Sequence, residues 1–215
     1  MSSPVVLITG GARGIGAGIA KSFLKAGYST MIADIGVHSD KTDWAYEFAT
    51  PSDINALKKE SPDLRACFVD VTNFKSCQEA VSQTIESFGR LDVLINNAGV
   101  VNSGPIEYFD ETAWDKIFEV NTKGIFLMTK ASLSDLKKSK APSIINTASI
   151  AGKKGYANMS AYCGSKFAAI GITQSLASEL APHGIRVNAI CPGMVGTAMW
   201  LDHLLPTNAT DHNQK

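Results

Sequence analysis

The chain has 215 residues, of which 45% are hydrophobic, and its 20 basic and 20 acidic side chains leave no formal net charge. This length suits one large core and is short for two domains of usual size. The balanced charge gives no electrostatic support to a nucleic-acid or membrane-surface role. The apolar runs are too short to cross a membrane and no cleavage-like signal is seen, so we expect a soluble, cytoplasmic protein. Four cysteines without paired metal spacing fit a reducing compartment, and four scattered histidines indicate no catalytic metal.

Apolar runs bounded by turn residues predict six strands separated by helices. The expected strands cover residues 4–9, 29–34, 65–69, 91–95, 142–148 and 185–190. This alternation is typical of an α/β fold with a doubly wound parallel sheet of the Rossmann type, in three layers α/β/α. We expect a single domain over residues 1–206, followed by a polar, disordered tail over 207–215.

A glycine-rich turn follows the first predicted strand, in the run Thr9-Gly-Gly-Ala-Arg-Gly-Ile-Gly16. Glycine permits a tight turn and a close approach to a pyrophosphate, whose charge then lies at the N-terminus of the next helix. The glycines at 10, 14 and 16 depart from the Gly-x-Gly-x-x-Gly spacing, and tight strand-to-helix turns need glycine in any case. The position of this glycine-rich run, between an apolar strand and an amphipathic helix, nevertheless favours a dinucleotide site.

An acidic residue, Asp34, ends the second predicted strand. A carboxylate there can accept hydrogen bonds from ribose hydroxyls and repels a 2′-phosphate, which favours NAD. Arg13, inside the glycine loop, is the contrary signal because it could pair with that phosphate. Either residue could also be an ordinary solvated loop charge. We therefore expect NAD, with NADP as the alternative.

The segment 36–64 is the least regular part of the chain and contains Pro51 and Pro62. We expect an extra helix or a flexible excursion beside the adenine end of the nucleotide, and we assign it no function.

Polar residues mark the ends of two later strands and one helix. Asn96-Asn97-Ala98-Gly99 follows the predicted strand 91–95, and Ser149 follows the strand 142–148. Open α/β sheets bind ligands at this edge, although a polar turn or a helix cap would look the same. Asn121 interrupts an amphipathic helical pattern, which predicts a bend or a buried hydrogen bond.

Tyr162 and Lys166 lie four residues apart in a helix-like stretch and therefore share one face. A tyrosine titrates near ~10, whereas a general acid/base works best near the operating pH. A neighbouring ammonium favours the phenolate and so lowers the pKa of the phenol. Alone, the spacing is typical of an amphipathic helix; together with the other motifs it favours an enzyme.

Together with Asp70-Val71 and the run Pro192-Gly-Met-Val-Gly-Thr197, these motifs resemble the short-chain dehydrogenase/reductase family from residue 4 to about 200. The resemblance implies hydride transfer between a nicotinamide cofactor and a small secondary alcohol or ketone. It assigns proton transfer to Tyr162, substrate orientation to Ser149 and a proton relay to Asn121. It implies that Lys166 lowers the pKa of Tyr162 and holds the nicotinamide ribose. It assigns cofactor contacts to Gly10, Arg13, Gly14, Ile15, Gly16, Asp34, Asp70, Val71, Asn97, Ala98, Gly99, Tyr162, Lys166, Pro192, Gly193, Val195 and Thr197.

Within the family, the segments 152–156, 181–184 and 197–200 resemble acetoin, butanediol and polyol (sorbitol-type) dehydrogenases. Met199 and Trp200 would begin a segment that covers the substrate, or they pack as part of a short helix. A nucleotide-binding regulator without chemistry is the alternative function. A sugar-nucleotide epimerase is disfavoured because it needs a large C-terminal substrate domain.

By resemblance, family members continue past Pro192-Gly193 with a lid, a helix and a seventh strand, whereas this sequence ends soon after Trp200. We therefore expect a sheet without the seventh strand and a form that binds cofactor but is weakly active or inactive. The resemblance also implies a homo-oligomer, here at most a dimer through helices near 112–135 and 160–180. A truncated version of an ordinary longer enzyme is equally compatible with the sequence.

Overall fold

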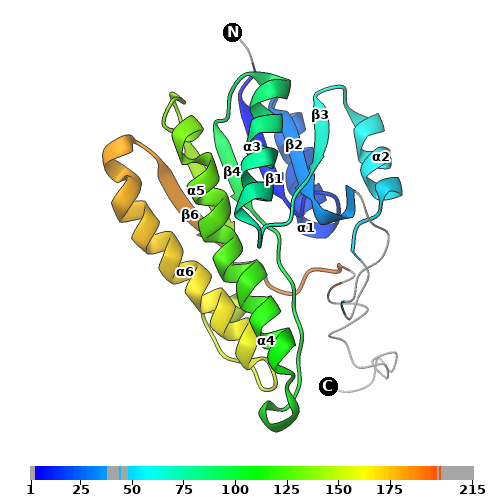
Figure 1. Ribbon diagram of the computed structural model, residues 1–215, viewed down its shortest axis with the longest axis vertical. Coiled ribbons are helices and arrows are strands. Elements are labelled where there is room, and N and C mark those ends of the chain that lie inside the picture. Colours follow the sequence, from blue (N-terminus) through cyan, green and yellow to red (C-terminus); the bar gives the residue numbers. More distant parts are fainter. Residues whose placement is uncertain (1–2, 38–43, 45–47, 198, 200–215) are drawn as a thin grey trace.

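The computed structural model describes residues 3–37, 44, 48–197 and 199. Six strands form one parallel sheet in the order β3-β2-β1-β4-β5-β6 (Figure 1). They are β1 (Val5–Thr9), β2 (Ser29–Asp34), β3 (Leu64–Phe68), β4 (Val93–Asn96), β5 (Ser143–Thr147) and β6 (Arg186–Ile190). Each lies within two residues of its predicted range, so the doubly wound parallel sheet is confirmed. The expected disordered tail, 207–215, lies outside the described residues.

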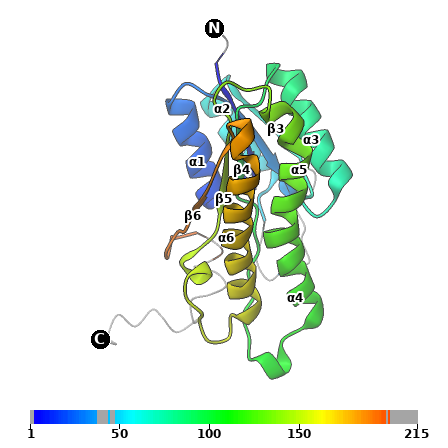
Figure 2. The ribbon, with the colours of Figure 1, turned by 90° about the vertical axis from the view of Figure 1, so that its left-hand side faces the viewer.

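Helices cover both faces of the sheet. The longer ones are α1 (Gly14–Lys25), α2 (Pro51–Glu60), α3 (Phe74–Phe88), α4 (Glu111–Phe118), α5 (Gly124–Leu136) and α6 (Ser160–Leu180). Short turns complete the pattern at η1 (Ile35–Val37), η2 (Ile106–Tyr108), η3 (Glu119–Lys123), η4 (Ile150–Gly152) and η5 (Ala181–His183). Figure 2 shows α1 on one side of the sheet and α3 with α5 on the other, which gives the predicted three layers.

The central strand β1 explains how the two cores form. Every residue of β1 is buried, as expected for a parallel strand covered on both faces. Leu7 belongs to the core beneath α3 and α5, whereas Val6 and Ile8 belong to the core beneath α1 and α2. Side chains of successive strand residues point to opposite faces, so one short apolar run supplies both cores.

The segment 36–64 contains helix α2, which begins at Pro51 behind a complete capping box. Thr50 accepts a hydrogen bond from the Asp53 main-chain N–H, and the Asp53 carboxylate accepts one from the Thr50 main-chain N–H at 2.8 Å. The predicted extra helix is therefore present. Residues 38–43 and 45–47 of this segment lie outside the described residues.

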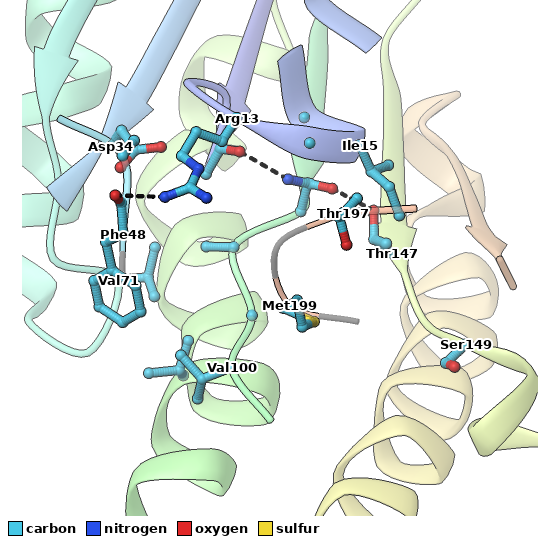
Figure 3. Close-up of a pocket in the computed structure, with 18 of the residues that line it drawn as sticks. Arg13, Ile15, Asp34, Phe48, Val71, Val100, Thr147, Ser149, Thr197 and Met199 are labelled. Carbon is cyan, nitrogen blue, oxygen red and sulfur yellow. Dashed lines mark hydrogen bonds between the residues drawn. The ribbon is translucent and has the colours of Figure 1, made fainter. Parts of the chain in front are cut away.

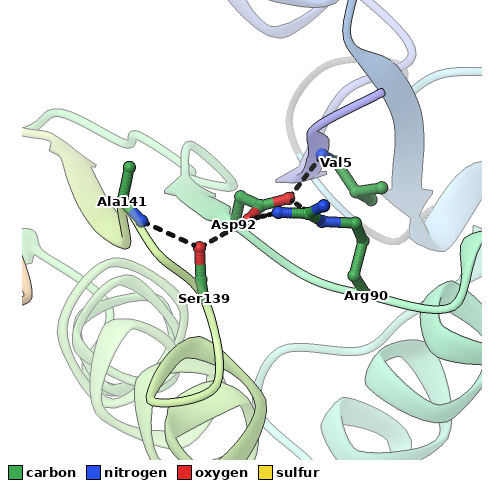
Figure 4. A network of polar contacts seen from close by, with 5 residues as sticks. All are labelled: Val5, Arg90, Asp92, Ser139 and Ala141. Carbon is green, nitrogen blue, oxygen red and sulfur yellow. Dashed lines mark hydrogen bonds and ion pairs between the residues drawn. The ribbon is translucent and has the colours of Figure 1, made fainter. Parts of the chain in front are cut away.

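A buried carboxylate fastens the amino ends of the central strands (Figure 4). Asp92 accepts hydrogen bonds from the Val5 main-chain N–H at 2.8 Å, from two Arg90 nitrogens at 2.7 and 2.8 Å, and from the Ser139 hydroxyl. Burial acts to raise the pKa of Asp92, but the hydrogen bonds from Arg90, Ser139 and Val5 outweigh it and lower the pKa. This network joins β1, β4 and the α5–β5 turn.

The strand order reverses between β1 and β4, because the chain passes from β1 outward to β3 before returning to β4. Open parallel sheets bind ligands outside the carboxyl ends of the strands at such a point. Among the described helices, none is both long and apolar enough to span a membrane.

Candidate dinucleotide and alcohol site

A single pocket at this edge of the sheet contains nearly all of the predicted site residues (Figure 3). Every residue to which a cofactor contact was assigned lines it, and so does Ser149. Asn121 is the exception and lies behind the pocket wall. The motifs did not identify another group of lining residues, namely Ile35, Phe48, Ala49, Val69, Val100, Lys116, Val120, Thr147 and Ala148. Met199 also lines the pocket, and Trp200 lies outside the described residues.

The glycine loop has the geometry that an anion needs. Gly10 and Gly14 have φ angles of +61° and +50°, which favour glycine, and a Cβ on Gly16 would lie 2.0 Å from the Gly10 carbonyl oxygen. Helix α1 begins after Arg13 with no side-chain cap and no acidic residue in its first turn. Its first N–H groups and the positive end of its dipole therefore suit a pyrophosphate, so these residues fit a dinucleotide.

Asn97 holds this loop in place through its side chain. Its amide nitrogen donates to the main-chain oxygens of Thr9 at 3.1 Å and Gly10 at 3.0 Å. The Thr9 hydroxyl in turn accepts the N–H groups of Asn97 and Ala98, both at 3.0 Å. Sequence reasoning assigned Thr9 no role, although a threonine at the end of β1 was the available signal. Asn97 thus shapes the pocket by clamping β1 to β4.

Two charged residues lie at one end of the pocket. Asp34 is buried and accepts hydrogen bonds from the N–H groups of Ala12 at 3.1 Å and Gly36 at 3.0 Å. Burial raises the pKa of Asp34, while these hydrogen bonds and the nearby Arg13 charge oppose the rise. The Arg13 guanidinium donates to the main-chain oxygen of Phe48 at 2.7 Å (Figure 3). Asp70 also lines the pocket, and its carboxylate accepts two hydrogen bonds from Thr72.

Tyr162, Lys166 and Ser149 meet at the other end. Tyr162 lies in the first turn of α6 and is partly buried, and the Ser149 hydroxyl lies near its phenol. Lys166 is only 4% exposed, and its ammonium donates to the Thr147 main-chain oxygen at 2.8 Å. The ammonium lies 5.7 Å from the centre of the Tyr162 ring. The expected shared face is therefore present.

The pKa values of this pair differ from the expectation. Burial raises the pKa of Tyr162, and the nearby Ser149 hydroxyl only partly opposes the rise. Burial also lowers the pKa of Lys166 to about 8, because the charged form loses its hydration. We expected the ammonium to lower the pKa of the phenol, but in this structure burial raises that pKa.

Asn121 braces the wall of the pocket from behind. It lies 1% exposed in the π-helical turn η3, which confirms the predicted bend and buried hydrogen bonds. Its side chain accepts from the Val100 N–H and donates to the Val100 oxygen, both at 2.8 Å, and donates to the Ser165 hydroxyl at 3.0 Å. A Cβ on Gly99 would lie 3.2 Å from the Asn121 oxygen and 3.5 Å from the Lys166 nitrogen. Gly99 therefore keeps the space between these two groups open.

The segment after β6 closes the pocket against the glycine loop. The Pro192 oxygen accepts the N–H of Ile150 at 3.0 Å, and a Cβ on Gly14 would lie 3.1 Å from the Thr197 methyl carbon. Residues 192–197 therefore span from η4 to the start of α1. Within the residues that the structure describes, no three His, Cys, Asp or Glu side chains gather as a metal site.

Comparisons with known proteins place these features in context. The family model described as short chain dehydrogenase matches residues 4–204. Galactitol 2-dehydrogenase of Agrobacterium fabrum is 38% identical over 93% of this chain and 73% of its own length. (+)-Borneol dehydrogenase 2 of Salvia officinalis is 36% identical over 96% of this chain and 70% of its own length. The crystal structure of carveol dehydrogenase from Mycobacterium avium in complex with NAD superimposes with a TM-score of 0.86 at 31% identity, covering 94% of this chain and 74% of that one.

The family match includes all six strands and the whole described pocket, from the glycine loop to the segment after β6. The chain therefore belongs to the short-chain dehydrogenase family.

Proposed function

We propose that this chain is an NAD(H)-dependent oxidoreductase that interconverts a small secondary alcohol and its ketone, with Tyr162 as the general acid/base. One observation carries the proposal. The Tyr162 phenol, near the Ser149 hydroxyl and close to the buried Lys166 ammonium, shares one pocket with the glycine loop. A proton-transferring group and a pyrophosphate cradle are thus held in one cavity.

The roles follow from the positions of the side chains. The uncapped start of α1 binds the pyrophosphate, and the Ser149 hydroxyl orients the substrate oxygen beside Tyr162. During oxidation the Tyr162 phenolate takes the proton of the substrate hydroxyl as the C–H hydride leaves. A nicotinamide cofactor, when bound, accepts that hydride and returns it in the reverse direction. Lys166, whose ammonium donates to the Thr147 oxygen, favours the phenolate through its charge and would contact the nicotinamide ribose of a bound cofactor.

NAD is the proposed cofactor because of the arrangement around Asp34. Its buried carboxylate lies beside the glycine loop, where it can accept from ribose hydroxyls and repel a 2′-phosphate. Arg13, the residue that favoured NADP, donates to the Phe48 carbonyl. The superimposed carveol dehydrogenase contains NAD, which supports the same choice.

The proposed substrate class is a small secondary alcohol or ketone of the acetoin, butanediol or polyol kind. The relatives are named for a sugar alcohol, a terpene alcohol and a hydroxysteroid, so the test must cover all of them. We would assay galactitol, sorbitol, butanediol, acetoin, borneol, carveol and a 3α-hydroxysteroid with NAD(H) and NADP(H), using Tyr162→Phe as the inactive control. Turnover that disappears in this variant supports the proposal. Nucleotide binding without turnover on the whole panel would contradict it and favour the nucleotide-binding regulator.

We also propose that two copies associate through α4, α5 and α6, which lie side by side in Figure 1. Phe126 on α5 and Phe167 on α6 are 53% and 48% exposed, and Phe118, Phe126 and Ile172 line a shallow groove on this face. Exposed aromatic side chains on neighbouring helices favour burial against a partner. Sedimentation should show a dimer that dissociates in Phe126→Glu; a wild-type monomer at micromolar concentration would refute this assembly.

A further inference from the structure

Phe48 and Ala49, to which no motif assigned a function, line one wall of the pocket. They belong to a segment of which the structure describes Trp44 and residues 48–50. Three contacts of the described residues hold it there. The Trp44 indole donates to the Val101 main-chain oxygen at 3.1 Å, and Arg13 donates to the Phe48 oxygen at 2.7 Å. Gly36 lies so close to Ala49 that a Cβ on it would stand 1.9 Å from the Ala49 oxygen. The segment is therefore a built part of the site.

The Phe48 side chain occupies this wall at the end of the pocket that contains Asp34. Its ring lies beside Val71, with Val100 at the next position along the pocket (Figure 3). Val69 and Val120 extend the same apolar lining. A flat aromatic face beside aliphatic side chains suits a planar heteroaromatic ring, because such rings stack on aromatic groups. The nearby carboxylate of Asp34 suits the ribose attached to that ring.

We propose that Phe48 is the aromatic wall against which the adenine ring packs, and that Arg13 is a positioning residue that holds Phe48 through its main-chain oxygen. This inference rests on the proposed function, since it requires the dinucleotide to bind here. It assigns to Arg13 a role that is the same for NAD and NADP. The rival assignment makes Arg13 a ligand of the 2′-phosphate.

Calorimetry with ADP-ribose, NADH and NADPH tests the role of Phe48. Phe48→Ala should weaken ADP-ribose and NADH by about 10- to 100-fold, the effect of losing one base–aromatic stack. Phe48→Tyr should bind ADP-ribose like the wild type, and Phe48→Leu, which keeps most of the apolar volume, should lose part of the affinity. Tyr108→Ala removes an 80% exposed tyrosine outside the pocket lining and is the matched control, with unchanged affinity. Wild-type affinity in Phe48→Ala would overturn the inference.

The role of Arg13 is tested by a double-mutant cycle. Arg13→Met should weaken NADH and NADPH by the same factor and should have no further effect in the Phe48→Ala background, because residues that act through one another are not additive. Selective loss of NADPH affinity in Arg13→Met, or full additivity with Phe48→Ala, would overturn the positioning role. If the wild type binds none of the three nucleotides, the proposed function itself fails. If the wild type binds the nucleotides but the Phe48 and Arg13 variants do not show the expected losses of affinity, this inference alone fails.

Discussion

The ammonium group of Lys166 lies 5.7 Å from the centre of the Tyr162 ring and donates its hydrogen bond to the main-chain oxygen of Thr147. Burial opposes the charged form of both side chains, lowering the pKa of Lys166 to about 8 and raising the pKa of Tyr162. The lysine therefore changes charge in a pH range that is accessible to experiment.

This shift predicts how stability depends on pH. The unfolded lysine, with its ordinary pKa of 10.5, binds more protons than the folded one between pH 8 and 10.5, so the free energy of unfolding should rise with pH over that window. The slope for one group is at most about 1.4 kcal/mol per pH unit. Urea denaturation at several pH values would measure it. Lys166→Met should lack this component, so equal pH dependence in the two proteins would contradict the prediction.

Replacing Tyr162 by phenylalanine should abolish turnover and leave NADH affinity nearly unchanged, because it removes only the hydroxyl group that transfers the proton. A positioned general acid/base contributes roughly 100- to 10,000-fold to a rate. Steady-state kinetics and NADH titration measure the two effects separately. Tyr156→Phe, at a 40% exposed tyrosine beside Lys154, is the matched control and should keep the wild-type rate. A near-normal rate in Tyr162→Phe would contradict the proposed mechanism.

Two glycines of α1 should respond in opposite ways to alanine. A Cβ on Gly16 would lie 2.0 Å from the Gly10 oxygen, so Gly16→Ala should displace the loop and abolish NADH binding. A Cβ on Gly18 would meet nothing within 4 Å, so Gly18→Ala should keep NADH affinity and stabilise the helix by about 0.5–1 kcal/mol. Calorimetry and thermal unfolding of the pair decide the matter. Unchanged NADH affinity in Gly16→Ala would show that the loop does not hold the cofactor.

The charge of Asp34 should decide between the two nicotinamide cofactors. Asp34→Asn keeps the shape of the side chain and removes its repulsion of a 2′-phosphate. The kcat/KM with NADP should therefore rise relative to the kcat/KM with NAD by about tenfold or more. A factor of about ten corresponds to one unfavourable charge contact of roughly 1.4 kcal/mol. Asp63→Asn, on the exposed turn before β3, is the control. A wild-type enzyme that prefers NADPH would contradict the assignment of Asp34.

The network around Asp92 (Figure 4) should matter for stability and not for catalysis, because it lies at the amino ends of the strands and none of its residues lines the pocket. Asp92→Asn should lower the free energy of unfolding by about 1.5–3 kcal/mol, the value of hydrogen bonds to a charged group. Since the folded pKa of Asp92 is lowered, this stabilisation is complete above the ordinary value of 3.8 and is lost as the pH falls through the folded pKa. Urea denaturation of Asp92→Asn and of the wild type would measure the change in stability, and initial rates would measure the change in activity. A large change in kcat would contradict a purely structural role of the network.

The sheet was predictable because its strands are short apolar runs buried on both faces, as in β1 and β4. The glycine loop, Asp34 and Ser149 were predictable because each lies at or just beyond the carboxyl end of a strand. The partner of Lys166 was not, since it is a main-chain oxygen and every residue carries one. The part played by Phe48 was not predictable either, because its segment has no periodicity and its place depends on distant contacts with Arg13 and the core around Val71. Asn121 lies between these cases: its unsuitability for a helix interior indicated a bend or a buried hydrogen bond, but not that Val100 is the partner.

The hydrogen bonds from Asn97 to Thr9 and Gly10 join segments 88 and 87 residues apart along the chain. Closing so long a stretch costs conformational entropy and slows folding relative to local contacts. A nascent polypeptide therefore carries its whole glycine loop within the first sixteen residues, yet the loop gains its clamp only after β4 has left the ribosome and paired with β1. A nucleotide that binds only the completed loop then stabilises the folded chain by mass action.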